Sequence, residues 1–196
     1  MTKTILLFDV MGTLVSEPFL KAMPQFFGMP LEQLRQEAHP TAWVDFEKDL
    51  MTEQQFCDQF FKDGRSVDRQ GLRKCLFDAY DWLSGMEDLL TELHRDGFSI
   101  YALSNYPIWY EMIEEKLSLS RFLTWDFVSC RTGFRKPDPE AYLVVTQKLG
   151  VAASDCFFID DRQENVDAAI ELGMDAVLIE NATTLREQFC QRGLLT

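Results

Sequence analysis

Hydrophobic residues form two patterns along this chain: short unbroken runs, and repeats at a spacing of three or four. The first unbroken run covers residues 5–8, Ile-Leu-Leu-Phe, and Asp9 follows it. A run of this length bounded by turn residues is typical of a strand buried on both faces of a parallel sheet. We therefore expect Asp9 at the carboxyl end of that strand, the edge of an open α/β sheet where ligands bind. The alternative is that Asp9 only caps or solvates the strand end.

From Gly85 onward, apolar runs alternate with segments of helical spacing. This alternation predicts right-handed βαβ units and a parallel sheet that helices cover on both faces. The expected elements are, in order, the helix 86–95, the strand 98–103, the helix 108–117, the strand 125–128, the helix 140–149, the strand 156–159, the helix 164–172, the strand 176–179 and a C-terminal helix.

The stretch from residue 19 to residue 82 shows helical spacing and no convincing strand. We expect several short helices there, which form an insertion within the α/β unit. The predicted organisation is an α/β core domain of residues 1–16 and 84–196, with a helical cap of residues 17–83. The aromatic side chains at helical spacing in this stretch, expected to pack inside it although any one of them could face a ligand, are Phe56, Phe60 and Phe61.

Polar residues follow the predicted strands, and crossover helices place the carboxyl ends of parallel strands at one edge of the sheet. Several matching polar groups at those ends would be an odd coincidence in a purely structural domain, so we expect a single site. The residues concerned are Asp9 after the first strand, Ser104 and Asn105 after the second, Lys136 between the third strand and the next helix, and Asp160 and Asp161 after the fourth.

The net negative charge of the chain makes nucleic acid an unfavourable binding partner. The formal net charge is -13 and the isoelectric point is near 4.5, which argues against nucleic-acid binding because no basic excess exists to replace counterions on a phosphate backbone. No apolar run approaches the roughly 20 residues that span a bilayer. We expect an intracellular, cytoplasmic protein, and the sequence does not indicate its oligomeric state.

Cysteine and histidine positions exclude several kinds of site. The five cysteines are scattered and never closely paired, which speaks against a disulfide framework or a zinc site. The two histidines, His39 and His94, do not lie beside other candidate ligands. A histidine-based metal centre or a histidine-activated serine is therefore not expected.

The expected site has the composition of a phosphoryl-transfer centre. Carboxylates gathered closely are costly unless a cation joins them, and Mg²⁺ prefers a few carboxylates together with water and phosphate oxygens. Lys136 adds a positive charge, and Ser104 and Asn105 can donate hydrogen bonds to phosphoryl oxygens. These groups could surround a carboxylate nucleophile that forms an aspartyl-phosphate.

Four short motifs, in this order, resemble those of the haloacid dehalogenase superfamily. The resemblance covers the whole chain, and it implies a doubly wound sheet ordered 5-4-1-2-3 with a small helical cap between the first two motifs. It also implies hydrolysis of a small phosphate ester with Mg²⁺ as cofactor. The motifs are Asp9 with Gly12-Thr13, then Ser104, then Lys136-Pro137-Asp138-Pro139, and then Ile159-Asp160-Asp161.

The resemblance also assigns roles to individual residues. Asp9 would be both nucleophile and metal ligand, and Lys136 would hold the phosphoryl group and complete the catalytic pair. The remaining implied roles are phosphoryl binding by Ser104, Asn105 and Thr13, and metal binding by Asp160, Asp161 and the backbone carbonyl of Met11.

Met11 departs from the pattern of the family's phosphatases. They usually carry there a second aspartate, which acts as general acid and base, and losing such a group commonly costs about 10²- to 10⁴-fold in rate. Three interpretations remain open: a slower phosphatase, a phosphatase whose leaving group needs little protonation, or a protein that binds a phosphometabolite or a partner without turnover. A metal-independent haloacid dehalogenase also lacks the second aspartate, but the acidic pair at 160–161 favours phosphate.

Several segments are also similar to the chloroplast flavin mononucleotide (FMN) hydrolases of plants, which implies FMN as the first substrate to test, with a sugar phosphate as the alternative. The segments are 11–15 (MGTLV), 105–110 (NYPIWY) and 135–139 (RKPDP). Aromatic residues that could stack on a flavin ring are Tyr106, Trp109 and Tyr110. The alternative is that Ile108, Trp109 and Met112 simply form the buried side of a helix. Further candidates are Arg131, Arg135 and Arg162 for anion binding and Asn165 for orienting a metal-bound water.

Overall fold

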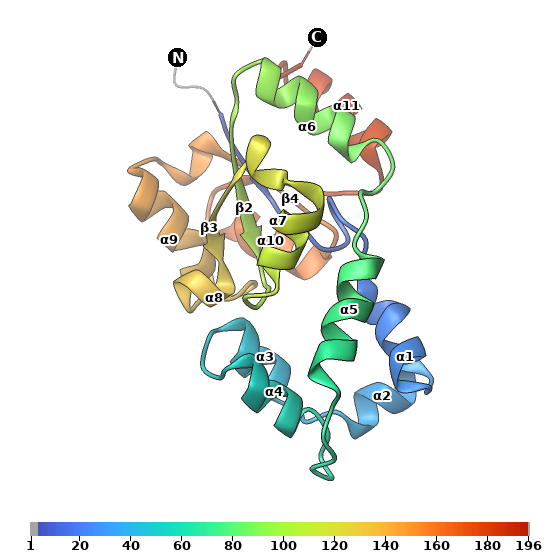
Figure 1. The fold of residues 1–196 in the computed structure, drawn as a ribbon. Helices are drawn as coiled ribbons and strands as arrows, with labels where there is room; N and C mark the ends of the chain where they lie inside the picture. Colours follow the sequence, from blue (N-terminus) through green and yellow to red (C-terminus); the bar gives the residue numbers. More distant parts are fainter. Residues whose placement is uncertain (1–3, 196) are drawn as a thin grey trace.

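A five-stranded, all-parallel sheet forms the centre of the computed structural model, which describes residues 4–195 (Figure 1). The strand order is β3-β2-β1-β4-β5, which confirms the predicted doubly wound arrangement. The strands are β1 (Ile5–Phe8), β2 (Ser99–Ser104), β3 (Thr124–Val128), β4 (Cys156–Asp160) and β5 (Asp175–Leu178).

Helices cover both faces of this sheet. Successive side chains of β1 point to opposite faces, so Leu6 and Phe8 join one buried cluster and Leu7 joins the other. Burial on both faces explains the unbroken apolar run in the sequence. Helices α6 (Met86–Arg95), α7 (Tyr110–Leu117) and α11 (Ala182–Gln191) pack against the first face, and α9 (Pro139–Leu149) and α10 (Gln163–Glu171) pack against the second.

Between β1 and α6 the chain forms the inserted helices, which lie together in the lower half of Figure 1, away from α6 and α11. Phe56, Phe60 and Phe61 are all buried there, with ring centroids of neighbouring pairs 5.4 Å and 4.8 Å apart, so their expected packing role is confirmed. The inserted helices are α1 (Ala22–Phe27), α2 (Leu31–Glu37), α3 (Ala42–Glu47), α4 (Glu53–Gln59) and α5 (Arg69–Ala79).

The remaining elements are short. A helical turn, α8 (Ser129–Thr132), follows β3 directly and was not predicted from the pattern. The helix expected to begin at residue 108 begins at Tyr110, after a turn in which the Tyr110 N–H bonds to the Pro107 carbonyl. The 3-10 helices are η1 (Pro18–Leu20), η2 (Leu119–Arg121) and η3 (Ala153–Asp155).

Across residues 4–195, each helix is too short or too polar to cross a bilayer. All five cysteines carry free thiols, as their scattered positions predicted.

Candidate active site

The register of the sheet brings the predicted strand-end residues to one edge. Phe8 of β1 pairs with Ala102 of β2 on one side and with Ile159 of β4 on the other. Asp9 continues this alignment, because its backbone N–H bonds to the Ile159 carbonyl at 2.9 Å. The carboxyl ends of β1, β2 and β4 therefore lie side by side, as the sequence predicted.

Lys136 ties two of these strand ends together. Its Nζ lies 2.8 Å from Oδ1 of Asp9 and 2.5 Å from Oδ2 of Asp160, and its side chain is only 1% exposed. Burial opposes the charged form, but the two adjacent carboxylates outweigh it and raise the pKa of Lys136 above its usual value. Lys136 is therefore a fixed positive charge beside Asp9.

Asn105 holds the backbone of Lys136 in place. Its Nδ2 donates to the Lys136 carbonyl, and its Oδ1 accepts from the Lys136 N–H, both at 2.8 Å. Sequence reasoning expected the Asn105 amide to donate to a phosphoryl group, whereas here this amide joins the end of β2 to the loop before α9. Because that loop carries Lys136, Asn105 positions the ammonium group.

The two consecutive aspartates after β4 have different surroundings. Asp160 is fully buried, and its carboxylate accepts hydrogen bonds from the side chains of Lys136 and Asn165 and from the backbone N–H of Arg162. Asp161, in contrast, faces the loop that follows β1 and lines the same cavity as Asp9. Asn165, expected to orient a metal-bound water, lines the inner cavity and donates from its Nδ2 to the Asp160 carboxylate.

The loop after β1 requires glycine at position 12. Gly12 has a φ of 80°, and a Cβ placed on it would lie 2.5 Å from Oδ2 of Asp161. The loop closes through hydrogen bonds from the N–H groups of Leu14 and Val15 to the Val10 carbonyl. This tight turn brings the backbone close to the Asp161 carboxylate.

Two buried hydroxyl groups near the strand ends have no hydrogen-bond partner among the described residues. They belong to Ser104, which is 2% exposed, and to Thr13, which is fully buried. An unsatisfied buried polar atom costs about 1–3 kcal/mol, so such groups are expected where a ligand supplies the missing partner. Ser104 and Thr13 remain candidates for phosphoryl binding.

Two adjoining cavities open at this edge of the sheet. The first, which we call the inner cavity, measures about 100 Å³. The second, the outer cavity, measures about 250 Å³ and extends toward the inserted helices. The inner cavity is lined by Asp9, Met11, Glu17, Asn105, Lys136, Asp161, Arg162 and Asn165; the outer cavity is lined by Met11, Glu17, Phe19, Leu20, Trp43, Glu47, Asn105, Tyr106, Arg135 and Arg162.

An ion pair joins the inserted helices to the core across the outer cavity. Glu47 of α3 is buried, and its Oε1 lies 2.5 Å from Nε of Arg135, the residue before Lys136. Ser129 of α8 adds a hydrogen bond from its Oγ to the Glu47 carbonyl at 2.6 Å. Arg135 is thus held at the cavity wall by a partner 88 residues earlier in the chain.

Of the three aromatic residues considered for ring stacking, Tyr106 alone lines either cavity. Trp109 is fully buried between Phe46 and Phe56, with ring centroids 4.9 Å and 5.5 Å away. Tyr110 packs on Trp125. Stacking by Trp109 or Tyr110 is therefore wrong for this structure, because Trp109 is fully buried and Tyr110 is half-buried against Trp125. Of the residues expected on the buried side of this helix, Trp109 and Met112 are buried, whereas Ile108 is 40% exposed.

The three arginines considered for anion binding differ in whether they line a cavity. Arg162 lines both cavities, and Arg135 lines the outer one. Arg131 lines neither cavity and instead donates to the Trp125 carbonyl at 3.0 Å. Only the first two are placed to meet an anionic substrate.

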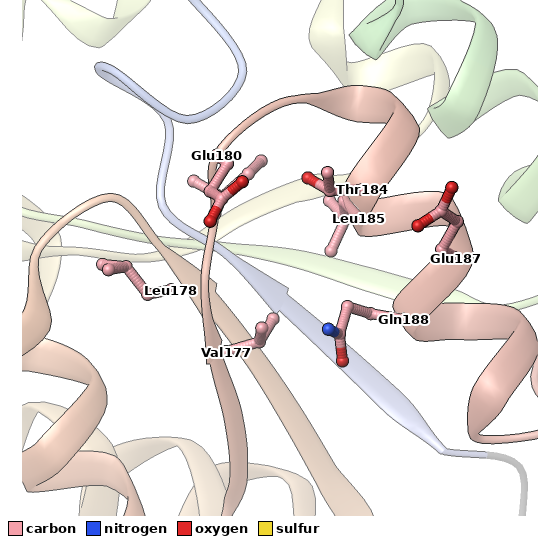
Figure 2. A pocket seen from close by; sticks show the side chains of 8 residues that line it. Val177, Leu178, Glu180, Thr184, Leu185, Glu187 and Gln188 are labelled. Atoms are coloured by element: carbon pink, nitrogen blue, oxygen red, sulfur yellow. The ribbon is translucent and has the colours of Figure 1, made fainter.

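A third hollow, which shares no lining residue with the inner and outer cavities, lies between β5 and the start of α11 (Figure 2). Its volume is about 190 Å³, and the labelled Leu178, Glu180 and Glu187 lie along it. Its lining contains neither lysine nor arginine. It therefore lacks the fixed cations that an anionic ligand needs in a protein of this net charge.

Comparison with known proteins decides the family. A family model described as haloacid dehalogenase-like hydrolase matches residues 3–173. The chain belongs to this family of hydrolases. Flavin mononucleotide hydrolase 1, a chloroplast protein of Arabidopsis thaliana, is 50% identical to it over 190 residues, which cover 97% of this chain and 78% of the relative.

Other relatives of this haloacid dehalogenase-like hydrolase are more distant. Phosphoglycolate phosphatase 1 of Pseudomonas aeruginosa is 27% identical, over 87% of this chain and 66% of the relative. A family enzyme of Bacteroides thetaiotaomicron, solved as a magnesium complex, has a TM-score of 0.76 at 22% identity, covering 96% of this chain and 99% of the other. That structural likeness shows the same fold.

The donor set of this hydrolase suits a magnesium ion. Within residues 4–195, no three acidic, histidine or cysteine side chains gather closely enough to hold a metal by themselves. Mg²⁺ does not need them, because it commonly takes one or two carboxylates and completes its shell with water and substrate phosphate. Burial raises the pKa of the Asp9 carboxyl and nearby Asp160 raises it further, against the opposing charge of Lys136. A divalent cation would relieve that cost.

Sequence reasoning missed Glu17 and Glu47. Glu17 is the first acidic residue after Asp9 in the chain, which is the one signal that could have drawn attention to it. Glu47 carried no such signal, since a charged residue in a helical segment is usually solvated. Glu17 lies at the start of η1 and Glu47 lies on α3, so both belong to the segment between β1 and α6.

Proposed function

We propose that this enzyme is a Mg²⁺-dependent phosphatase that hydrolyses a small phosphate ester through an aspartyl-phosphate on Asp9. The observation that carries the proposal is the position of Asp9 between a fixed cation and an acidic metal-binding edge. Lys136 contacts it at 2.8 Å, and Asp161 lines the same cavity. This arrangement places a nucleophile, an anion-binding charge and metal ligands around one small space.

The residues that would hold Mg²⁺ are Asp9, Asp161 and the backbone carbonyl of Met11. Asp160 was also expected to bind the metal, but its carboxylate already accepts hydrogen bonds from three groups. We therefore assign Asp160 to the positioning of Lys136. When bound, Mg²⁺ neutralises charge on the phosphoryl group.

Side chains of the protein bind the phosphoryl group and supply the nucleophile. The unpartnered hydroxyls of Ser104 and Thr13 donate to phosphoryl oxygens, and Lys136 holds another phosphoryl oxygen. One Asp9 oxygen attacks phosphorus in line with the leaving oxygen, whose bond to phosphorus breaks. Water then attacks the phosphorus of the aspartyl-phosphate and releases inorganic phosphate.

FMN is the substrate that we assign first. The relative that is 50% identical over 97% of this chain is named for FMN hydrolysis. The outer cavity adds Phe19, Trp43 and Tyr106, whose rings suit a flavin, and Arg135 and Arg162 offset the negative charge of the protein near an anion. In this proposal the inserted helices act as a cap, because α3 supplies Trp43 and Glu47 to the outer cavity, and η1, which leads into α1, adds Phe19.

A panel of phosphate esters tests this function. We expect FMN to be hydrolysed in the presence of Mg²⁺, with release of riboflavin and phosphate and a larger kcat/KM than glucose 6-phosphate or phosphoglycolate. A chelator should abolish release, and added Mg²⁺ should restore it. Without substrate, Mg²⁺ should also raise the melting temperature of the protein, and Asp161→Asn should reduce that rise because it removes a ligand.

Other results of the panel point to the alternatives. Saturable binding of FMN without phosphate release would contradict turnover and indicate a binding protein. Halide release from haloacids without metal would indicate a dehalogenase. Hydrolysis of sugar phosphates but not of FMN would support the phosphatase function and contradict the assignment of FMN as substrate.

A further inference from the structure

Four residues line both the inner and the outer cavity: Met11, Glu17, Asn105 and Arg162. This boundary matters because the phosphoryl group of a bound ester would occupy the inner cavity and the leaving group the outer one. The bridging oxygen, which must gain a proton as it leaves, then lies where the two cavities meet. These four residues are therefore the first candidates for protonating it.

Only Glu17 among the four can both give and take a proton near neutral pH. The thioether of Met11 carries no exchangeable proton, the Asn105 amide does not titrate, and the Arg162 guanidinium stays protonated. Glu17 is also the first carboxylate after Asp9 in the chain, on the segment that leads into the inserted helices.

The position of the Glu17 side chain is fixed by a short local structure. Glu17 caps the 3-10 helix η1, and its Oε1 accepts a hydrogen bond from the Phe19 N–H at 2.9 Å. Its other oxygen, Oε2, has no hydrogen-bond partner among residues 4–195. One oxygen is thus anchored to the backbone, while the other stays free for a ligand in the cavities that Glu17 lines.

The environment of Glu17 favours a carboxyl group that keeps its proton to higher pH. Burial raises its pKa, and the negative charge of Asp161 raises it further, whereas the Phe19 N–H and the Arg162 guanidinium oppose the rise. Other titratable or charged groups that face it across the cavities or act on it are Asp9, Lys136, Glu47, Arg135 and the tyrosines Tyr80 and Tyr106, whose hydroxyls lie 2.7 Å apart.

We propose that Glu17 is the general acid and base of this enzyme and replaces the aspartate that the family's phosphatases usually carry where this chain has Met11. The proposal rests on the phosphatase function argued above. In the first step, Asp9 forms a bond to phosphorus as the ester P–O bond breaks, and the Glu17 carboxyl gives its proton to the departing oxygen. In the second, the Glu17 carboxylate takes a proton from the water that attacks the aspartyl-phosphate, and the P–O bond to Asp9 breaks.

The variant Glu17→Gln tests this assignment, because glutamine keeps the size and the Oε1 hydrogen bond but cannot donate a proton in this way. The measured quantity is kcat/KM, which reports only the steps up to departure of the leaving group. With FMN, whose leaving group is an alcohol, we expect a loss of about 10²- to 10⁴-fold. With 2,4-dinitrophenyl phosphate, which leaves without a proton, we expect less than about a 10-fold loss.

Two further readouts separate proton transfer from a structural role. The wild-type kcat/KM for FMN should fall as the pH rises through the Glu17 pKa, and this fall should be absent in Glu17→Gln. With 2,4-dinitrophenyl phosphate the variant should release one phenolate per active site in a burst before slow turnover, because the second step has lost its base. Adding Met11→Asp to Glu17→Gln should restore part of the FMN activity.

The controls make each outcome decisive. Glu187→Gln, at the hollow of Figure 2, removes a carboxylate that lines neither the inner nor the outer cavity, and it should leave the activity with both substrates unchanged. Equal losses with both substrates, or no loss with FMN, would overturn the role of Glu17 while leaving the phosphatase function intact. Absence of hydrolysis by the wild-type enzyme would overturn the phosphatase function, and this inference with it.

Discussion

Asp9→Asn is expected to lower kcat for phosphate release by about 10⁴-fold or more, with every phosphate ester and whatever the acidity of its leaving group. A carboxamide is too weak a nucleophile to form the aspartyl-phosphate, so no leaving group can compensate. This uniform loss distinguishes Asp9 from Glu17, whose replacement should spare an activated substrate. The measurement is phosphate release from FMN and from 2,4-dinitrophenyl phosphate with saturating Mg²⁺.

The matched control is Asp126→Asn on β3, a carboxylate that is half exposed and lines neither cavity. It should retain full turnover. Asp9→Asn should still fold, because the asparagine oxygen can accept from Lys136, and circular dichroism would verify this. Turnover by Asp9→Asn within 10-fold of wild type would show that another group attacks phosphorus.

Lys136→Met is expected to lower the free energy of unfolding by about 3–5 kcal/mol, in addition to removing activity. The Lys136 ammonium is enclosed with Asp9 and Asp160, and methionine would leave two buried carboxylates facing each other without a cation. Urea denaturation in the absence of metal measures this loss. Adding Asp160→Asn to Lys136→Met should recover part of it, because only one of the two carboxylates then remains charged.

Lys74→Met provides the comparison. Lys74 pairs with Asp78 one helical turn away, but their side chains are 75% and 58% exposed, so we expect a change within about 0.5 kcal/mol. If Lys136→Met cost no more than Lys74→Met, the buried pairs would not stabilise the site as described.

The sheet edge could be predicted from the sequence because it depends on local patterns and on one rule of topology. The run 5–8 is apolar throughout since β1 is buried on both faces, and parallel pairing then aligns Asp9, Ser104 and Asp160 without further information. Lys136 was expected at this edge for the same reason, because it lies in the loop between a predicted parallel strand and the predicted helix that follows it.

The roles of individual side chains at the edge could not be predicted in this way. Asn105 and Asp160 have the chemistry of ligands, but in the folded chain Lys136 and Asn165 engage them. Whether a polar side chain contacts a substrate or a neighbouring residue depends on differences in atomic position of less than about an ångström. The pattern of apolar and polar residues along a strand carries no information at that scale.

The contribution of the inserted helices was also beyond the sequence pattern. The Glu47–Arg135 pair joins residues 88 positions apart, and the placement of Glu17 depends on how η1 leaves the first loop. Trp109 could face either a ligand or the core by its helical position, and the packing of Phe46 and Phe56 around it decided the outcome. Such contacts arise from tertiary packing and leave no mark on periodicity.

The central claim is that a carboxylate of the protein attacks phosphorus before water does. The stereochemical course at phosphorus tests it most directly. The substrate is a phosphorothioate monoester made chiral by sulfur and two oxygen isotopes, and it is hydrolysed in water enriched in the third isotope so that the released thiophosphate is chiral. Each in-line displacement inverts phosphorus, so two successive displacements through Asp9 predict overall retention of configuration. Inversion would show that water attacks the ester in a single step, and it would contradict the aspartyl-phosphate.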